Sequence, residues 1–360
     1  MRIFLYYLIM VFLMVLAGCN TVGPASVRMG RAQYNIAIQQ TNGEQLLLNL
    51  VRLRYRDTPY FLEVASVSTS FDFGASASVN ASLVESSDNT YGIDTGISFS
   101  EQPTVTYTPL QGDEFVTQLM SPIDLNTILL LYHSGWSIDR IFRVTVQNIN
   151  GLKNAPSASG PTPDRVPVYE EFSNVTRLLR DLQVKGVLEM GQLIIGEHEK
   201  PGIELQIAEH AANWSEVKEL CELLGLEFGR THFTLTAEVG SGGKDRIVVV
   251  PRSLISSFFY VSQSVQPPQE DELAGRVTVS KDKEGNRFDW SKVTRGLMEI
   301  RSAKNRPQNA YMAVYYRGSW FYIDDSDLAS KSTFSLLMQL FALQAGEIKG
   351  TGPILTLPVN

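Results

Sequence analysis

The chain of 360 residues is 44% hydrophobic and 19% charged, which is the composition of an ordinary folded protein and excludes a disordered or collagen-like chain. Its 31 basic and 38 acidic residues give a net charge of −7. An acidic chain lacks the basic surface that general nucleic-acid binding requires, so no nucleic-acid partner is expected.

The N-terminus has the ordered parts of an export signal. Arg2 supplies a positive charge, and residues 3–16 are almost unbroken apolar sequence, shorter than the ~20 residues of a membrane-spanning helix. The residues that end this segment resemble the lipobox of bacterial lipoproteins: Leu16, Ala17, Gly18 and Cys19. The resemblance implies that signal peptidase recognises the first three, that residues 1–18 are removed, and that Cys19 is acylated, palmitate being one such acyl group.

Acylation of Cys19 would anchor the mature chain in membrane lipid, because two acyl chains hold a protein stably where a single chain binds marginally. The next residue is Asn20 rather than aspartate, and in such lipoproteins this implies sorting to the Gram-negative outer membrane. The alternative, that Cys19 lies by chance near an ordinary cleavage site, stays open. The only other cysteine is Cys221, whose helical spacing predicts a buried, inert thiol, so no disulfide is expected.

Two short helices are predicted in residues 19–60, which we interpret as the lipidated N-terminus and a helical segment. Ser26 is a suitable cap for the first helix, residues 41–43 (Thr-Asn-Gly) interrupt the pattern, and apolar residues return at helical spacing from Leu46 to Leu53. The arginines of this segment fit either contact with anionic lipid head groups or simple complementation of the helix dipoles.

A long amphipathic β-hairpin is predicted over residues 61–108. No Lys or Arg occurs from Asp57 to Asp139, whereas eleven acidic residues do. Within this stretch, residues 65–83 alternate between apolar and polar side chains with the period of two that is typical of a β-strand. The alternation returns at residues 91–99 after a polar turn, which predicts a second strand folded back on the first.

These two strands are much longer than the five or six residues of an ordinary strand. Folding them about the turn places Ala75 opposite Phe99 and Phe73 opposite Glu101, and leaves a nine-residue charge-free face on each strand. A transmembrane β-strand needs ~9–11 residues, so the hairpin fits one contribution to a pore shared by at least four subunits. A water-exposed arm, or the edge of a half-buried sheet, fits as well. The residues assigned to this membrane or assembly face are Phe71, Phe73, Val79, Leu83, Tyr91, Ile93, Ile97 and Phe99.

The remainder is predicted to form a mixed body of helices and antiparallel sheet, which makes the chain α+β. A helical segment covers residues 109–152, and a proline-rich linker or loop at 153–167 marks a predicted boundary before a C-terminal α+β domain at 168–360. Helical patterns occupy residues 115–120, 125–132, 138–149, 169–182, 214–224, 254–265 and 333–345. Strand patterns occupy residues 187–195, 202–208, 229–239, 245–250, 311–316 and 320–323.

No motif has the spacing of a catalytic or metal-binding site, so no catalytic residue, metal or cofactor is predicted. The loop at residues 240–244 ends in lysine but lacks the Ser or Thr and the following helix of a Walker phosphate loop. The acids Asp324, Asp325 and Asp327 precede the last helix and are interpreted as capping residues rather than metal ligands. The four histidines show no zinc spacing, and no nucleophile elbow accompanies them.

The whole chain resembles an uncharacterised family of proteobacterial outer-membrane lipoproteins, in stretches such as residues 46–64, 103–119 and 320–337. This resemblance implies a location and no activity. We therefore expect a lipid-anchored, non-enzymatic protein of the outer membrane that is a structural or assembly component of the cell envelope. It would act with other envelope proteins or as the hairpin-donating subunit of a homo-oligomeric pore. The alternative is a periplasm-facing enzyme or ligand-binding lipoprotein.

Overall fold

The computed structural model describes residues 34–82, 90–109, 112–193, 202–238, 240, 242–345 and 355–358. Its helices occur together with one six-stranded and two three-stranded sheets, which confirms the predicted α+β class. The chain divides into two compact units. We call them the body, from the described parts of residues 1–59 and 113–348, and the ribbon unit, from those of residues 60–112 and 349–360.

Several helices of the body bury an apolar stripe, as their sequence spacing predicts. In α6, for example, Val217, Leu220, Cys221 and Leu224 recur at intervals of three and four residues, and all four are buried. A first helix covers residues 34–54. The others are α2 (Asp113–Met120), α3 (Leu125–His133), α4 (Ile138–Thr145), α5 (Glu170–Val184), α6 (Ser215–Leu224), α7 (Leu254–Ser262), α8 (Gln269–Leu273), α9 (Ser291–Thr294) and α10 (Leu328–Ala345).

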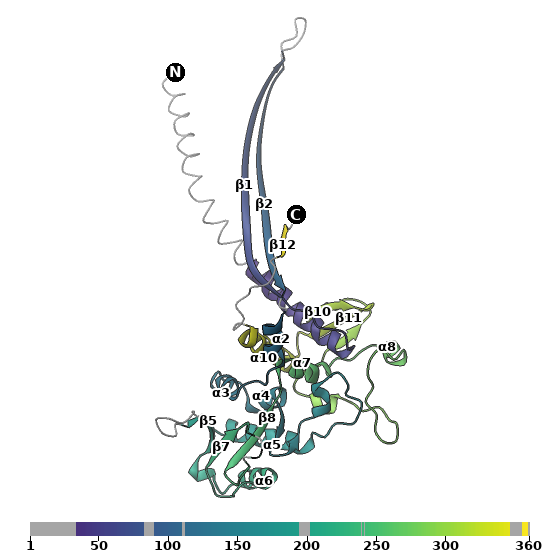
Figure 1. Cartoon of the computed structure of the whole chain (residues 1–360). Helices are drawn as coiled ribbons and strands as arrows, with labels where there is room; N and C mark the ends of the chain where they lie inside the picture. The colour runs from purple at the N-terminus through teal and green to yellow at the C-terminus, as the bar shows by residue number, and fades with distance from the viewer. Residues whose placement is uncertain are drawn as a thin grey trace. The chain divides into compact units, whose positions relative to one another are not determined.

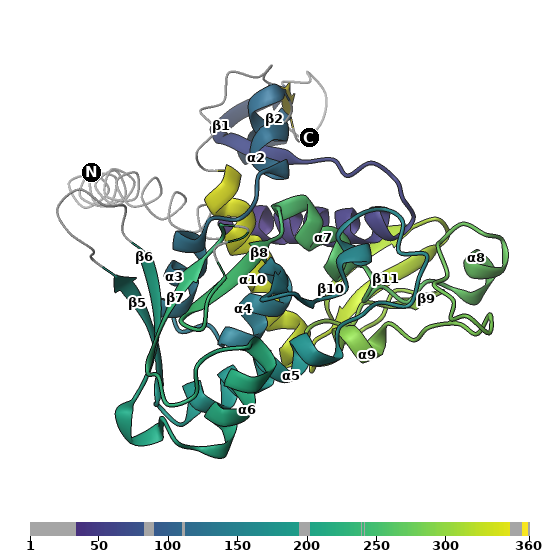
Figure 2. The same ribbon diagram turned by 60° about the horizontal axis from the view of Figure 1, so that its bottom comes forward.

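The larger sheet of the body has the strand order β4-β3-β8-β7-β6-β5, and Figure 2 shows several of these strands side by side. Neighbouring strands are antiparallel except β7 and β8, which run parallel. The sheet is therefore mixed, whereas the sequence predicted a purely antiparallel one. The strands are β3 (Val146–Ile149), β4 (Leu152–Lys153), β5 (Leu188–Leu193), β6 (Gly202–Ile207), β7 (His232–Thr236) and β8 (Arg246–Pro251).

One face of this sheet is buried, because apolar residues alternate with polar ones along its central strands. Ile203, Leu205 and Ile207 of β6 are buried, as are Phe233 and Leu235 of β7. Alternation of this kind is what a sheet covered on one face requires. Helix α5 contacts both β4 and β5, and α3 contacts β5 and β6.

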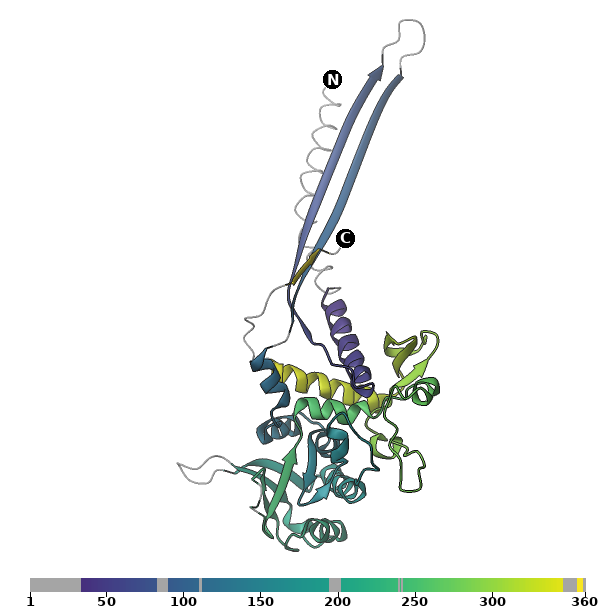
Figure 3. The same ribbon diagram turned by 45° about the vertical axis from the view of Figure 1, so that its right-hand side comes forward.

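The second sheet of the body has the order β10-β11-β9 and is antiparallel. Its strands are β9 (Arg301–Ala303), β10 (Ala310–Tyr316) and β11 (Ser319–Asp324). The last helix of the body, α10, lies beside α7 (Figure 3), and Leu336, Leu337 and Leu340 of α10 are fully buried. Helix α10 is therefore a core helix of the body.

The first helix is continuous through residues 41–43, so the two short helices predicted there are wrong. Gly43 does not break the helix. Its lack of a side chain leaves room for residues of other elements to pack against the helix. A Cβ atom at Gly43 would lie 2.5 Å from Met312 Cε and 3.6 Å from Phe334 Cε1. The glycine thus allows the helix to approach β10 and α10 closely.

The helix predicted at residues 138–149 is shorter than expected. It ends at Thr145, and residues 146–149 form β3, which pairs with β8. The Thr145 hydroxyl donates to the carbonyl of Ile141 (2.7 Å), and the next backbone group is already in the extended region at Val146. A short apolar segment fits a helix or a strand equally well, and residues 146–149 form a strand because they pair with β8.

The proline-rich segment 153–167 lies within the body instead of separating two domains. It includes a short 3₁₀ turn, Pro156–Ser159, and it is held by the fully buried guanidinium of Arg252. Arg252 donates to the backbone carbonyls of Val146 (2.9 Å) and Asn154 and to the hydroxyl of Ser159 (2.9 Å). These bonds tie the segment to β3 and β8, so its prolines mark a packed loop.

The ribbon unit contains the predicted β-hairpin, formed by β1 (Leu62–Ser82) and β2 (Thr90–Pro109). The two strands pair antiparallel and run side by side along their length (Figure 1). A strand that was not predicted, β12 (Leu355–Pro358), pairs antiparallel with β2 at residues 104–107. The resulting sheet has the order β1-β2-β12.

The register of the hairpin differs from the predicted one by two residues. Phe73 lies opposite Phe99, and Ala75 lies opposite Ile97, whereas the prediction placed Phe73 opposite Glu101. A shift of two keeps every residue on its predicted face, because side chains alternate with a period of two. The polar turn offers no residue that demands one loop length, which is why the register inferred from the sequence pattern was wrong by two residues.

Candidate functional site

The edges of the ribbon are the first candidate site. Among the described residues, β1 pairs only with β2, and β2 has a second partner only where β12 covers residues 104–107. The section in which residues 69–82 pair with residues 90–103 is therefore two strands wide within the described chain. Unpaired N–H and C=O groups along such edges are a template for pairing with another strand.

The register gives this section a charge-free face. From the pair Phe73–Phe99 to the pair Ala81–Tyr91, every second residue of both strands is uncharged, over nine residues of each strand. Nine residues at ~3.3 Å each span about 30 Å, which is the thickness of the hydrocarbon core of a bilayer.

The structure places most of the predicted face residues in this section. Val79 pairs with Ile93, Phe73 pairs with Phe99, and Phe71 lies opposite Glu101, just beyond the charge-free face. Leu83 lies outside the described residues. So do the residues predicted for signal-peptidase recognition and lipidation, which are Leu16, Ala17, Gly18 and Cys19.

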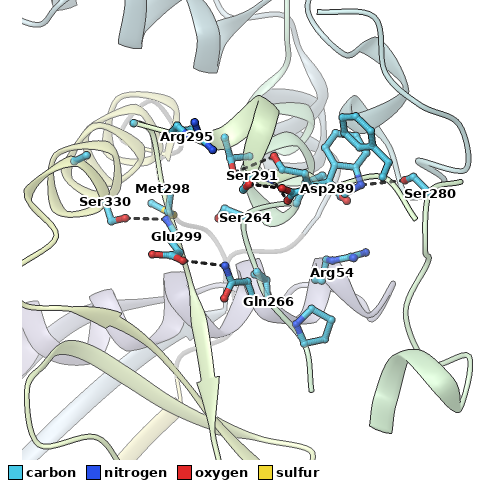
Figure 4. Close-up of a pocket in the computed structure, with 18 of the residues that line it drawn as sticks. Arg54, Ser264, Gln266, Ser280, Asp289, Ser291, Arg295, Met298, Glu299 and Ser330 are labelled. Carbon is cyan, nitrogen blue, oxygen red and sulfur yellow. Dashed lines mark hydrogen bonds between the residues drawn. The ribbon is translucent and has the colours of Figure 1, made fainter. Parts of the chain in front are cut away.

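The second candidate site is a pocket of about 740 Å³ in the body (Figure 4). Four segments that are distant in the sequence line it: the end of the first helix at Arg54, residues 263–267 after α7, residues 279–299 around α9, and the start of α10. No single segment carries the pattern of a site, which is why the sequence did not predict this pocket. The one sequence signal of this pocket was Arg54, a charged residue at a position that belongs to the buried helical stripe of Leu47, Leu50 and Val51.

Three buried polar side chains of this pocket have atoms without a hydrogen-bond partner in the described part of the chain. They are Nε of Arg54, Oε1 of Gln263 and Oγ of Ser264. These residues are only 5%, 5% and 4% exposed, respectively. Native proteins satisfy nearly all buried polar groups, so three such atoms in one pocket call for an explanation.

The acidic residues of the pocket, in contrast, have partners. The carboxylate of Asp289 accepts from the backbone N–H (2.9 Å) and the hydroxyl (2.8 Å) of Ser291, and these bonds hold its pKa below the usual range. Glu299 accepts from Gln266 (2.9 Å) and from Arg301 (2.7 Å). The carboxylates of Asp289 and Glu299 therefore have hydrogen-bond partners, whereas Arg54 in the same pocket has no acidic partner among the described residues.

Of the three acids before the last helix, Asp327 caps the helix as predicted, whereas Asp324 bonds to a residue ahead of the helix and Asp325 pairs with a lysine. Asp327 accepts from the backbone N–H of Ser330 (3.0 Å), and Asp324 accepts from that of Ser326 (2.9 Å). Asp325 lies 2.7 Å from Lys331. Within the described residues, no three His, Cys, Asp or Glu side chains are grouped as metal ligands would be.

Cys221 is buried in the core, as predicted. Its side chain is 1% exposed, and burial raises the pKa of the thiol to about 11.

Two of the histidines contact polar or aromatic side chains. His232 Nδ1 lies 3.2 Å from Glu204, and the His210 ring packs edge-on to Trp214. No helix in the described residues has both the length and the apolar character to cross a membrane.

Comparisons with known proteins found no family model, no curated protein and no solved structure that matches this chain.

Proposed function

We propose that this chain is a lipid-anchored structural or assembly component of the bacterial outer membrane that joins copies of itself through the ribbon. The observation that carries the proposal is the two-strand-wide section with a charge-free face, residues 73–81 of β1 opposite residues 91–99 of β2. Acylation of Cys19, which the lipobox-like residues before it imply, supplies the anchor in this proposal.

Pairing between copies follows from the cost of unpaired strand edges. A two-stranded ribbon is marginally stable in water, and in lipid each unsatisfied backbone group costs several kcal/mol. Edge-to-edge pairing of ribbons satisfies these groups, and a closed sheet leaves none of them open. Because such closed sheets have at least ~8 strands, two strands from each copy require four or more copies.

The size of the detergent-extracted particle tests the proposal. We expect a high-mass form of four or more copies when the full-length protein is extracted and its mass is measured by light scattering. A particle that contains a single copy at all protein concentrations contradicts the proposal and favours a water-exposed arm.

A pair of lysine substitutions tests which face contacts lipid. Val79→Lys places a charge on the charge-free face, where lysine costs about 2–4 kcal/mol at the bilayer midplane. Ser78→Lys places the same charge on the opposite face one residue away and is the matched control. We expect Val79→Lys to reduce the high-mass form and Ser78→Lys to retain it. Equal effects of the two variants contradict a lipid-facing role for Val79.

A further inference from the structure

We propose that the pocket of the body binds a ligand with a singly charged anionic group, a carboxylate or a phosphodiester, through Arg54, with Gln263 and Ser264 as hydrogen-bonding partners. The pocket lies entirely within the body, so this inference does not depend on assembly through the ribbon.

Arg54 is the residue that selects an anion. Its guanidinium makes one hydrogen bond, from Nη1 to the carbonyl of Thr278 (2.9 Å), and no carboxylate of the described chain lies within ion-pair distance. Glu272, whose charge acts on Arg54, is already paired with Arg287 at 2.7 Å. A buried guanidinium without a counter-charge is costly, and its planar fork suits two oxygens of one carboxylate or phosphate group.

Burial also makes the charged form of Arg54 less favourable. It lowers the pKa of the guanidinium to about 10, mainly because the charged form is removed from water. The side chain therefore remains charged at neutral pH while it lacks an acidic partner. An anionic ligand in the pocket would supply that partner.

Gln263 and Ser264 supply two further polar groups at the same pocket. The Gln263 amide nitrogen donates to the carbonyl of Phe259 (3.2 Å), while its oxygen has no partner among the described residues. The hydroxyl of Ser264, which lines the pocket in Figure 4, has none either. A buried polar atom without a partner costs about 1–3 kcal/mol, and ligand groups would recover this loss.

The rest of the lining limits the ligand. The charged residues of the lining are three acids, Asp289, Glu299 and Asp327, and two arginines besides Arg54, namely Arg287, which is paired with Glu272, and Arg295. The three acids offset the three arginines, so the lining has no formal excess of positive charge to hold a second negative charge on a ligand. Trp290 and Met298 add apolar surface, and the indole of Trp290 is fixed by a hydrogen bond to Ser280 (3.0 Å). The lining therefore favours one anionic group on an apolar or aromatic skeleton.

The competing interpretation is that Arg54 only fastens the first helix to the carbonyl of Thr278. The two interpretations differ in binding, which calorimetry measures on the full-length protein in detergent. The probes are benzoate and diethyl phosphate, with benzyl alcohol as the neutral analogue and benzylammonium as the cationic one. Arg54→Met removes the charge, and Arg56→Met removes the same charge at an exposed position of the same segment, outside the pocket.

We expect at least one of the two anions to bind the wild type and Arg56→Met with equal affinity, and to bind Arg54→Met at least tenfold more weakly. The neutral and cationic analogues should bind the wild type at least tenfold more weakly than that anion. Tighter binding of benzoate assigns a carboxylate ligand, and tighter binding of diethyl phosphate assigns a phosphodiester such as a lipid head group.

The proposal is overturned if neither anion binds the wild type, or if Arg54→Met binds as the wild type does. Should Arg54→Met fail to fold, Ser264→Ala provides the test. Removal of a buried hydroxyl without a partner should leave the melting temperature unchanged or higher. We expect Ser264→Ala to weaken anion binding several-fold, and unchanged affinity in that variant also overturns the proposal.

Discussion

Asp271 shows how a single residue ties the first helix to the rest of the body. Its side chain is nearly fully buried and accepts hydrogen bonds from the Tyr55 hydroxyl (2.5 Å) and from Arg276 (2.5 Å). Burial raises the pKa of Asp271, but the bonds from Tyr55 and Arg276 outweigh it and hold the pKa below its usual value. Burial and the same bond to Asp271 raise the pKa of Tyr55.

This lowered pKa predicts that Asp271 makes stability depend on acidity. The unfolded state takes up a proton near pH ~3.9, at higher pH than the folded state does, so the contribution is complete above about pH 5 and is lost as the pH falls below that value. We expect Asp271→Asn to lower the free energy of unfolding by about 1–3 kcal/mol at pH 7. Urea unfolding from pH 7 to pH 3 should show this difference shrinking as the pH falls.

The exposed Asp164 offers a matched control for that titration. Asp164→Asn removes a carboxylate that has no ion pair in the described chain, and it should change the free energy of unfolding at pH 7 by less than about 0.5 kcal/mol. A difference between wild type and Asp271→Asn that stays constant from pH 7 to pH 3 would show that the carboxylate charge is not what stabilises the fold.

At the scale of elements, the first helix depends on close packing at Gly43. The Cβ of a larger residue would meet the terminal methyl group of Met312, which can move, and then the ring of Phe334. We expect Gly43→Val to lower the free energy of unfolding by about 1–3 kcal/mol through overpacking. Gly43→Ala should change it by less than about 1 kcal/mol, because better helix propensity offsets a small displacement of Met312.

Chemical unfolding of both variants measures this prediction. In addition, Gly43→Val combined with Met312→Ala should recover part of the loss, because the smaller side chain makes room for the new one. If Gly43→Val were as stable as the wild type, close packing against β10 would not be the reason for glycine in this helix.

The elements that the sequence predicted well are those with an unbroken period. The hairpin faces followed from the alternation in residues 65–83, and α5, α6 and α7 followed from apolar spacing. Gly43 misled the prediction because a glycine required by packing has the same local signal as a helix break. The apolar run at residues 146–149 misled it because strand pairing with β8 is a contact far along the chain.

At the scale of the whole molecule, the pocket could not be predicted because its polar residues come from four separate segments. The sequence shows Arg54 on an apolar helix face, but nothing near it in the chain identifies Gln263 or Ser264 as neighbours of the same cavity. The face of the ribbon, in contrast, was predictable because all of its residues belong to one hairpin.

The lipid anchor is a prediction about the whole molecule, and Cys19 is the residue that tests it. We expect Cys19→Ser to keep the uncleaved precursor size, to lose labelling with radioactive palmitate, and to abolish release of the mature lipoprotein to the outer membrane. Gel mobility and membrane fractionation measure these effects. Cys221→Ser is the control, because its thiol is buried in the core and should not affect location. Unchanged size and fractionation of Cys19→Ser would contradict the anchor.

The pairing of β12 with β2 has a consequence for the order in which the ribbon unit folds. Leu355–Pro358 lie some 250 residues along the chain from the part of β2 with which they pair, whereas β1 and β2 belong to one hairpin. Closing so long a loop costs more conformational entropy than closing a hairpin, so β12 should join the sheet after β1 and β2 have paired. Until β12 joins, the backbone of residues 104–107 is open to strands of other molecules.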